Sequence, residues 1–199
     1  HIAASTVEAQ ESVAIQVAEQ IVEVLNNNNI INALNAPSID PTVLETLKPY
    51  LSLCEKLGKF ASQMIDKKIK SVKCRFSGAV LEYPTEPLTT ACAKGIVEPS
   101  TDSPVNYVNA RHILHERGVE LIESKRSEVY RYSNLCTVIV EDETGYEFLV
   151  SGTVFDASHV RIVTVNDRSF VAVPEGNLIV IENEDVPGVV GDLTGDTRE

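Results

Sequence analysis

Apolar residues recur every three or four positions near the start of the chain, which is the spacing of one face of a helix. The stripe consists of Val13, Val17, Ile21 and Leu25. Ser5 and Glu8 stand three residues apart just before it, as in a capping box that satisfies backbone N–H groups at a helix start. We therefore predict a helix from about Thr6 to Leu25, which the run of asparagines at positions 26–29 ends.

The helical spacing returns between residues 41 and 65. The apolar positions there are Leu44, Leu47, Leu51, Cys54, Leu57 and Met64. Pro49 interrupts this pattern, and a proline is tolerated in the first turn of a helix but not in its interior. We expect a short turn that ends near Lys48 and a separate helix from Pro49 to about Ile65.

Two further helices are predicted where a helical pattern is followed by glycine, which readily adopts the left-handed conformation that ends a helix. They span about 87–94 and 106–117, and Gly95 and Gly118 follow them.

Short segments rich in β-branched residues predict the strands. One is residues 68–77, and the others follow Gly118, at residues 120–124, 136–142, 147–155, 160–166, 170–173 and 178–182. We predict an α+β fold: an N-terminal helix, then a mixed domain over residues 38–173. Its mostly antiparallel sheet has one face covered by the helices that begin at Pro49 and Asn106.

Composition and charge narrow the function classes. The chain has 199 residues, 43% of them hydrophobic, and 17 Lys and Arg against 29 Asp and Glu give a net charge of −12. A charge of this sign repels phosphate backbones and anionic lipids, so we expect neither nucleic acid nor a membrane as partner. No apolar run approaches the ~20 residues of a membrane span, and no secretory signal is visible. We expect a cytoplasmic location.

Few residues suggest chemistry by their spacing. Cys54, Cys74, Cys92 and Cys136 form no CxxC pair and are expected to be reduced thiols in or near the core. His112 and His115 lie on a predicted helix, but the string HILHE lacks a third ligand, so we expect surface histidines and no metal. His159 follows a turn and is expected to be exposed. No GxSxG, GxGxxG or Walker motif is present.

Arg161 and Arg168 flank one predicted turn. Two guanidinium groups at a sheet rim could bind a carboxylate or phosphate through charge-assisted hydrogen bonds. An ordinary solvated hairpin has the same spacing, and both interpretations stay open at this point.

Several blocks of the sequence, in order, resemble long D-3-phosphoglycerate dehydrogenases. The string HIAASTVEAQ resembles the end of their catalytic region. The blocks LKPYLSLCEKLGKF, AKGIVEP, VNYVNA, ERGVEL and VSGTVF resemble their intervening, allosteric substrate-binding domain, and NLIVIENEDVPGVVG resembles the start of their ACT domain.

The resemblance implies three parts. Residues 1–37 correspond to the end of the catalytic region and a linker, residues 38–175 to the intervening domain, and residues 176–199 to the first strand and loop of an ACT domain with a tail. It also implies that the chain is a portion of a longer enzyme. The full-length enzyme uses NAD, and we expect this portion to bind no cofactor.

The resemblance assigns roles to particular residues. His1 falls on the catalytic acid/base histidine, which is expected to be inert here, and Ala3 replaces the usual glycine near it. Arg161 and Arg168 match two basic positions that bind an anionic effector, and the third falls on Val173. The serine-binding loop of the ACT domain corresponds to Asn183, Asp185, Pro187 and Gly188, which form only half of such a site.

The resemblance implies a regulatory and assembly portion of an NAD-dependent oxidoreductase of serine biosynthesis, with no activity by itself. One alternative is the intervening domain of an L-serine dehydratase β region, and another is a dimerisation module without a ligand. The string HIAASTVEAQ favours the dehydrogenase, because a dehydratase has no reason to keep a dehydrogenase's catalytic segment. We expect self-association, in which the apolar stripe of the first helix docks on a second copy or the helix is poorly ordered.

Overall fold

The computed structural model describes residues 7–27, 41–127, 131–156 and 158–181. In chain order its elements are α1 (Val7–Asn27), α2 (Pro41–Gln63), β1 (Ile69–Gly78), α3 (Glu86–Val97), α4 (Ala110–Glu116), β2 (Glu120–Arg126), β3 (Asn134–Asp142), β4 (Glu147–Phe155), β5 (His159–Val165) and β6 (Arg168–Ala172). Short 3-10 turns lie at Ala79–Glu82 and Glu98–Ser100. Helices followed by a mixed sheet confirm the predicted α+β fold, including its N-terminal helix.

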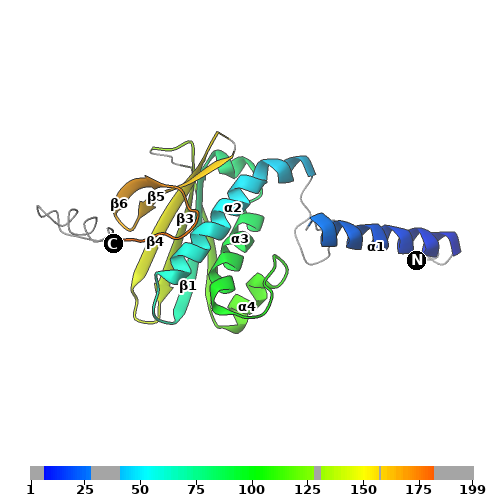
Figure 1. Ribbon diagram of the computed structural model, residues 1–199, viewed down its shortest axis with the longest axis horizontal. Coiled ribbons are helices and arrows are strands. Elements are labelled where there is room, and N and C mark those ends of the chain that lie inside the picture. The colour runs from blue at the N-terminus through cyan, green and yellow to red at the C-terminus, as the bar shows by residue number, and fades with distance from the viewer. Residues whose placement is uncertain (1–6, 28–40, 128–130, 157, 182–199) are drawn as a thin grey trace, which may run out of the picture.

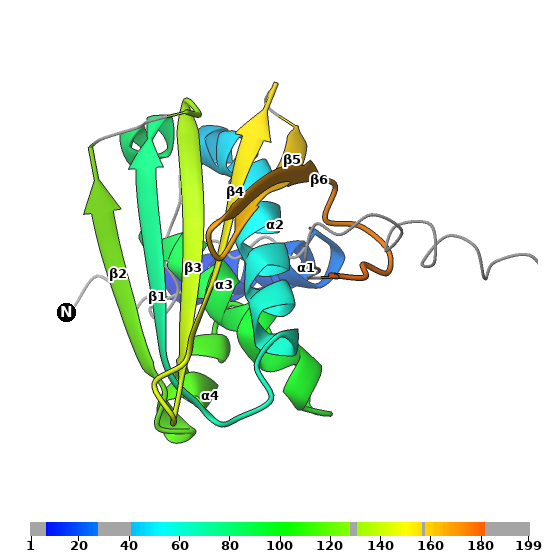
Figure 2. The same ribbon diagram turned by 90° about the vertical axis from the view of Figure 1, so that its left-hand side faces the viewer.

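The strands form one sheet in the order β2-β1-β3-β4-β5-β6. Strands β1 and β2 are parallel, and every other neighbouring pair is antiparallel. Figure 2 shows β2, β1 and β3 side by side, with the helices behind them. A parallel pair needs a long crossover, and here the segment with α3 and α4 provides it. The sheet is therefore mostly antiparallel, as predicted.

Helices α2 and α3 cover one face of the sheet (Figure 1). The core between these layers is closed by Leu53 and Leu57 of α2, Phe76 of β1 and Phe148 of β4, each at most 1% exposed. Because successive residues of a strand point to opposite faces, the alternate positions of the same strands form a second face without helices.

The turn predicted to end near Lys48 and the helix predicted to begin at Pro49 form one continuous helix, α2, with the proline inside it. The prediction of a break was wrong because it weighed only local backbone preference. An interior proline costs about 3 kcal/mol, and the burial of Leu47 and Tyr50 on both sides of it offsets this cost.

Gly95 does not end α3, which continues to Val97. Instead, α2 and α3 touch backbone to backbone at this glycine: a Cβ atom on Gly95 would lie 2.0 Å from the carbonyl oxygen of Glu55. Gly58 has the same role on α2, because its Cβ would lie 2.3 Å from the carbonyl oxygen of Cys92. Gly95 permits the close packing of the two helices. The sequence pattern alone does not distinguish this role from that of a glycine at the C-terminal end of a helix. Gly118, by contrast, follows α4 with a φ of 74°, as predicted for a helix end.

The helix predicted from Asn106 begins later, at Ala110. The side chain of Asn106 accepts hydrogen bonds from the backbone N–H groups of Val108 and Asn109 at 2.9 and 3.0 Å. These bonds favour a turn over a helix, as asparagine commonly does.

The strand predicted at residues 178–182 is not formed over 178–181, and residue 182 lies outside the described part. Leu178, Ile179, Val180 and Ile181 are exposed. A strand requires a hydrogen-bonded neighbour, and none of the described strands pairs with this segment.

The four cysteines are free and buried, as expected. The apolar stripe of α1 is exposed at Val13, Val17 and Ile21. Self-association through this stripe stays a prediction.

The backbone contact between α2 and α3 is testable by replacing Gly95 with Ala. Overpacking costs about 1–3 kcal/mol, and the upper end applies here because the neighbours of the added methyl group are backbone atoms. We expect this loss in the free energy of urea unfolding. Ser52→Ala, at an exposed position of α2, is the matched control and should change stability by less than about 0.5 kcal/mol. Equal stability of both variants would contradict the proposed contact.

Candidate functional site

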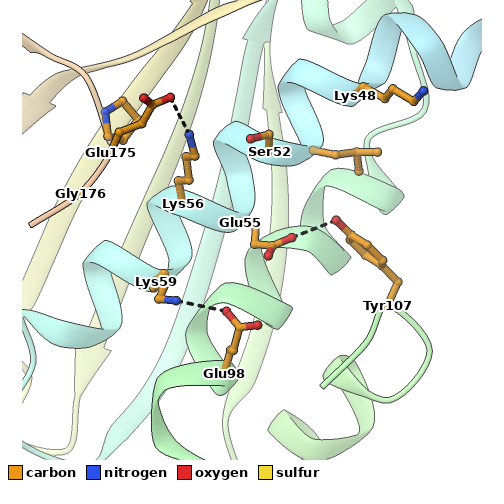
Figure 3. A pocket seen from close by; sticks show the side chains of 11 residues that line it. Lys48, Ser52, Glu55, Lys56, Lys59, Glu98, Tyr107, Glu175 and Gly176 are labelled. Atoms are coloured by element: carbon orange, nitrogen blue, oxygen red, sulfur yellow. Dashed lines mark hydrogen bonds and ion pairs between the residues drawn. The ribbon is translucent and has the colours of Figure 1, made fainter. Parts of the chain in front are cut away.

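A groove of about 600 Å³ runs along the outer side of α2 (Figure 3). Helix α2 forms its floor, the end of α3 and the loop before α4 form one wall, and residues 174–176 form the other. Its charged and hydroxyl-bearing residues are Lys48, Ser52, Glu55, Lys56, Lys59, Glu98, Tyr107 and Glu175.

Glu55 is the centre of the polar contacts on one side of this groove. Its carboxylate accepts hydrogen bonds from the Lys94 ammonium at 2.5 Å and from the Tyr107 hydroxyl at 2.9 Å. The Lys94 nitrogen also lies 5.4 Å from the centre of the Tyr107 ring, within range of a cation–π interaction. Burial raises the pKa of Tyr107, and the neighbouring Glu55 carboxylate raises it further.

Two longer ion pairs span the groove. Lys59 lies 3.4 Å from Glu98, and Lys56 lies 3.4 Å from Glu175, which follows the sheet in the chain. The lining thus holds three lysines and three glutamates, so it offers an anion no excess positive charge. Solvent-exposed pairs of this kind contribute about 0–1 kcal/mol each. The Lys56–Glu175 pair links residues 174–176 to α2.

These groove residues were not found from the sequence. Lys56 and Glu175 are 119 positions apart, and Glu55 and Tyr107 are 52 apart. No motif links such distant positions, since only the packing of the layers brings them together.

The structure does not bring the two predicted anion-binding arginines together. Arg168 is paired with Val165 across the β5–β6 hairpin, four residues from Arg161. At the rise of a strand, this separates their backbones by about 13 Å. Arg161 is half-buried and donates a hydrogen bond to the Val160 carbonyl at 2.7 Å, whereas the exposed Arg168 side chain lies 3.9 Å from Asp167.

The two side chains also belong to different faces of the sheet. The neighbours of Arg161, Val160 and Ile162, are buried in the core, so Arg161 points to the face without helices. Val165 is also in the core, because an irregularity in the register of β5 shifts the alternation. Directly paired residues share a face, which places Arg168 on the helix-covered side. Binding of one anion by both arginines stays a prediction.

The remaining predicted site residues fall into two groups. His1, Asn183, Asp185, Pro187 and Gly188 lie outside the described residues. Val173, at the third basic position of the family, is exposed.

His112, His115 and His159 are on the surface, as expected. His112 lies 3.4 Å from Glu116, with both side chains more than 60% exposed, and His159 is exposed beside Ser158. Within the described ranges, no three His, Cys, Asp or Glu side chains are arranged to hold a metal ion.

Comparison with known families gives the class of this fold. The profile of the family described as "D-3-phosphoglycerate dehydrogenase intervening domain" matches residues 46–166, more than half of the chain. The chain therefore belongs to this family, and the resemblance inferred from its sequence blocks is confirmed.

Curated relatives match the chain nearly from end to end. The D-3-phosphoglycerate dehydrogenase of Archaeoglobus fulgidus is 40% identical over 191 residues, which is 96% of this chain and 36% of the relative. The enzymes of that name from Synechocystis sp. and Bacillus subtilis are 34% and 31% identical, over 97% and 96% of this chain and 35% and 36% of the relative. The chain thus spans about a third of the length of the curated relatives it matches.

A search of the described helices for a membrane span found none of sufficient length and apolar character.

The contacts of Glu55 with Lys94 and Tyr107 predict that the protein becomes less stable at alkaline pH. In the folded protein the pKa of Tyr107 lies above its ordinary value of 10.0. The contribution of the protonated Tyr107 hydroxyl to folding stability is therefore fully present at pH values below 10.0. It is lost as the pH rises further, because the unfolded chain ionises first. An absorbance titration of phenolate should show steps above 10.0 for Tyr107 and for Tyr50, whose pKa burial also raises, and Tyr107→Phe should remove the Tyr107 step only. Tyr146→Phe, at a position 50% exposed, is the control that leaves this step in place. A Tyr107 step at or below the ordinary value would contradict the described contacts.

Proposed function

We infer that this chain is the regulatory and assembly portion of an NAD-dependent D-3-phosphoglycerate dehydrogenase, an oxidoreductase of L-serine biosynthesis. The observation that carries this proposal is the family match over residues 46–166, together with relatives of that name aligned to 96% of the chain. Each relative named above is a dehydrogenase, which favours this function over a dehydratase β region.

The proposed division of the chain follows the order of the family's parts. Residues 1–37 complete the catalytic region, 38–175 form the intervening domain, and 176–199 begin an ACT domain. In the whole enzyme, His1 exchanges a proton with the substrate hydroxyl while NAD, held by the rest of the enzyme, accepts the hydride. The loop with Asn183 and Asp185 contributes half of a serine site, and a second subunit provides the other half.

Self-association belongs to this proposal. The exposed apolar stripe of α1 and the exposed apolar segment 178–181 are surfaces that a longer chain or a second copy would cover. The relatives also include a chloroplastic enzyme of Arabidopsis thaliana, 33% identical, so the location is cytoplasm or plastid.

The regulatory role is the binding of an anionic effector at Arg161, with Arg168 as a second basic position. Arg161 is supported by its partial burial, which strengthens a charge-assisted hydrogen bond relative to one in open solvent. Because the whole chain carries a net charge of −12, affinity has to come from such short-range contacts.

Calorimetric titration of the chain with phosphate, 3-phosphoglycerate and phosphohydroxypyruvate tests this role. Arg161→Ala should remove a bond of ~1.5–3 kcal/mol and weaken binding by roughly tenfold to a hundredfold. Arg168→Ala, measured separately, shows whether the second arginine shares the ligand. Arg117→Ala, whose guanidinium donates to Ser100 at 2.6 Å far from the hairpin, is the control. If the parent chain binds none of these anions, or if Arg161→Ala binds them equally well, the proposal is wrong and the β5–β6 turn is an ordinary solvated hairpin.

The 199-residue chain should show no dehydrogenase activity, because it contains no glycine-rich loop of the kind that binds NAD. An assay of NADH formation with NAD and 3-phosphoglycerate should stay at the rate of buffer alone. Turnover above that rate would contradict the proposal that NAD is held by parts of the enzyme other than these residues.

A further inference from the structure

A row of hydroxyl-bearing side chains crosses the helix-free face of the sheet, with one arginine in it. Arg75 of β1 is paired with Ser124 of β2 on one side and with Thr137 of β3 on the other. Thr137 is in turn paired with Ser151 of β4, and their hydroxyl groups lie 2.9 Å apart. Since the residues on both sides of Arg75 along the strand are buried in the core, this row faces away from the helices. Figure 2 shows the three strands that carry its centre, β2, β1 and β3, adjacent to one another.

A second arginine lies beside the first. Arg126 is paired with Ser77, two positions further along both strands than the pair of Ser124 and Arg75. The two arginines are therefore diagonal neighbours on the same face, about 7–8 Å apart at the backbone. Burial lowers the pKa of Arg75, and the positive charge of Arg126 lowers it further.

No carboxylate neutralises this pair at close range. The positions of β2 and β3 nearest to Arg75 on this face, besides Ser124 and Thr137, are occupied by Ile122, Arg126, Leu135 and Ile139. Glu147 acts on Arg75 only as a more distant charge. Neither guanidinium group forms a hydrogen bond or ion pair with another residue in the part of the chain that the structure describes.

Other basic residues of the chain differ from Arg75 and Arg126 because they are paired with carboxylates. In a chain with 29 acidic residues, Lys59, Lys94 and Arg111 each have a carboxylate within 3.4 Å. Arg75 and Arg126 instead have hydroxyl groups beside them, and Lys73, two positions before Arg75 on β1, adds a third cation to the same face. Two adjacent guanidinium groups repel each other, and a doubly charged anion between them would neutralise both.

We propose that Arg75 and Arg126, together with the hydroxyl group of Ser77, form a binding site for a small dianion such as a phosphate monoester or a dicarboxylate. The site is separate from Arg161, which lies on β5, three strands from β1 and about 14 Å away across the sheet. The two sites can therefore fail or succeed independently.

The direct test is titration of the ¹⁵N-labelled 199-residue chain with inorganic phosphate, followed by amide chemical shifts, and then with malonate. We expect saturable shifts of the amides of residues 75–77 and 124–126. Arg126→Gln, at an exposed position, should weaken binding of phosphate by roughly tenfold or more, and Arg75→Gln should do the same. Arg111→Gln, which removes a guanidinium already paired with Glu86 at 2.9 Å, is the matched control and should leave the affinity unchanged. Arg161→Ala should also leave these shifts unchanged.

A stability measurement separates this binding role from a structural one. In phosphate-free buffer, Arg126→Gln should unfold at the same or a higher temperature than the parent chain, because it relieves repulsion. Phosphate should raise the unfolding temperature of the parent chain and raise that of the variant much less. The proposal is overturned if the amides of 75–77 and 124–126 do not shift, if shifts occur only near Arg161, or if both Gln variants bind as tightly as the parent. A marked loss of stability in Arg126→Gln without phosphate would assign it a structural role instead.

Discussion

The close backbone contact between α2 and α3 sets the arrangement of the other elements. Gly58 and Gly95 let the two helices approach until any Cβ atom would meet a carbonyl oxygen of the partner helix. A third glycine, Gly152 of β4, admits Leu53 of α2, whose Cδ1 would lie 2.6 Å from a Cβ at this position. Helices held together in this way fit side by side on one face of a six-stranded sheet. The opposite face is consequently left without helices.

That division into two faces separates two kinds of polar surface. On the helix side, lysines and glutamates from distant segments pair across the groove beside α2, and Lys56 with Glu175 links α2 to the segment that follows β6. On the helix-free side, Arg75 and Arg126 have no acidic partner among the described residues, whereas Glu141, nearer the other end of the strands, pairs with Lys70. An acidic chain attracts anions only where its few cations are gathered at short range, because long-range repulsion is screened within about 10 Å at 0.1 M salt. The helix-free face meets this condition at Arg75 and Arg126, and the groove does not.

The chain belongs to the intervening-domain family, and its described part presents two polar surfaces, the groove beside α2 and the row on the helix-free face. The polar clusters in the described part of the chain are ion pairs and hydroxyl rows, and the thiols are buried as small apolar side chains. Regulation through such a domain requires a ligand that binds one arrangement of the neighbouring parts better than another.

The sequence by itself determined the local structure wherever a short pattern was sufficient. The helical stripe predicted α1, β-branched segments predicted β1 to β6, and Gly118 marked the end of α4. The same local reasoning was wrong at Pro49 and Gly95, because burial and helix contact outweighed backbone preference there, and at 178–181, where no neighbouring strand is present. Tertiary structure alone decided three features. They are the sheet faces on which Arg161 and Arg168 lie, the groove at Glu55, and the proximity of Arg75 to Arg126. Their partners are separated by tens of residues, and strand register, including the irregularity in β5, decides which side chains share a face.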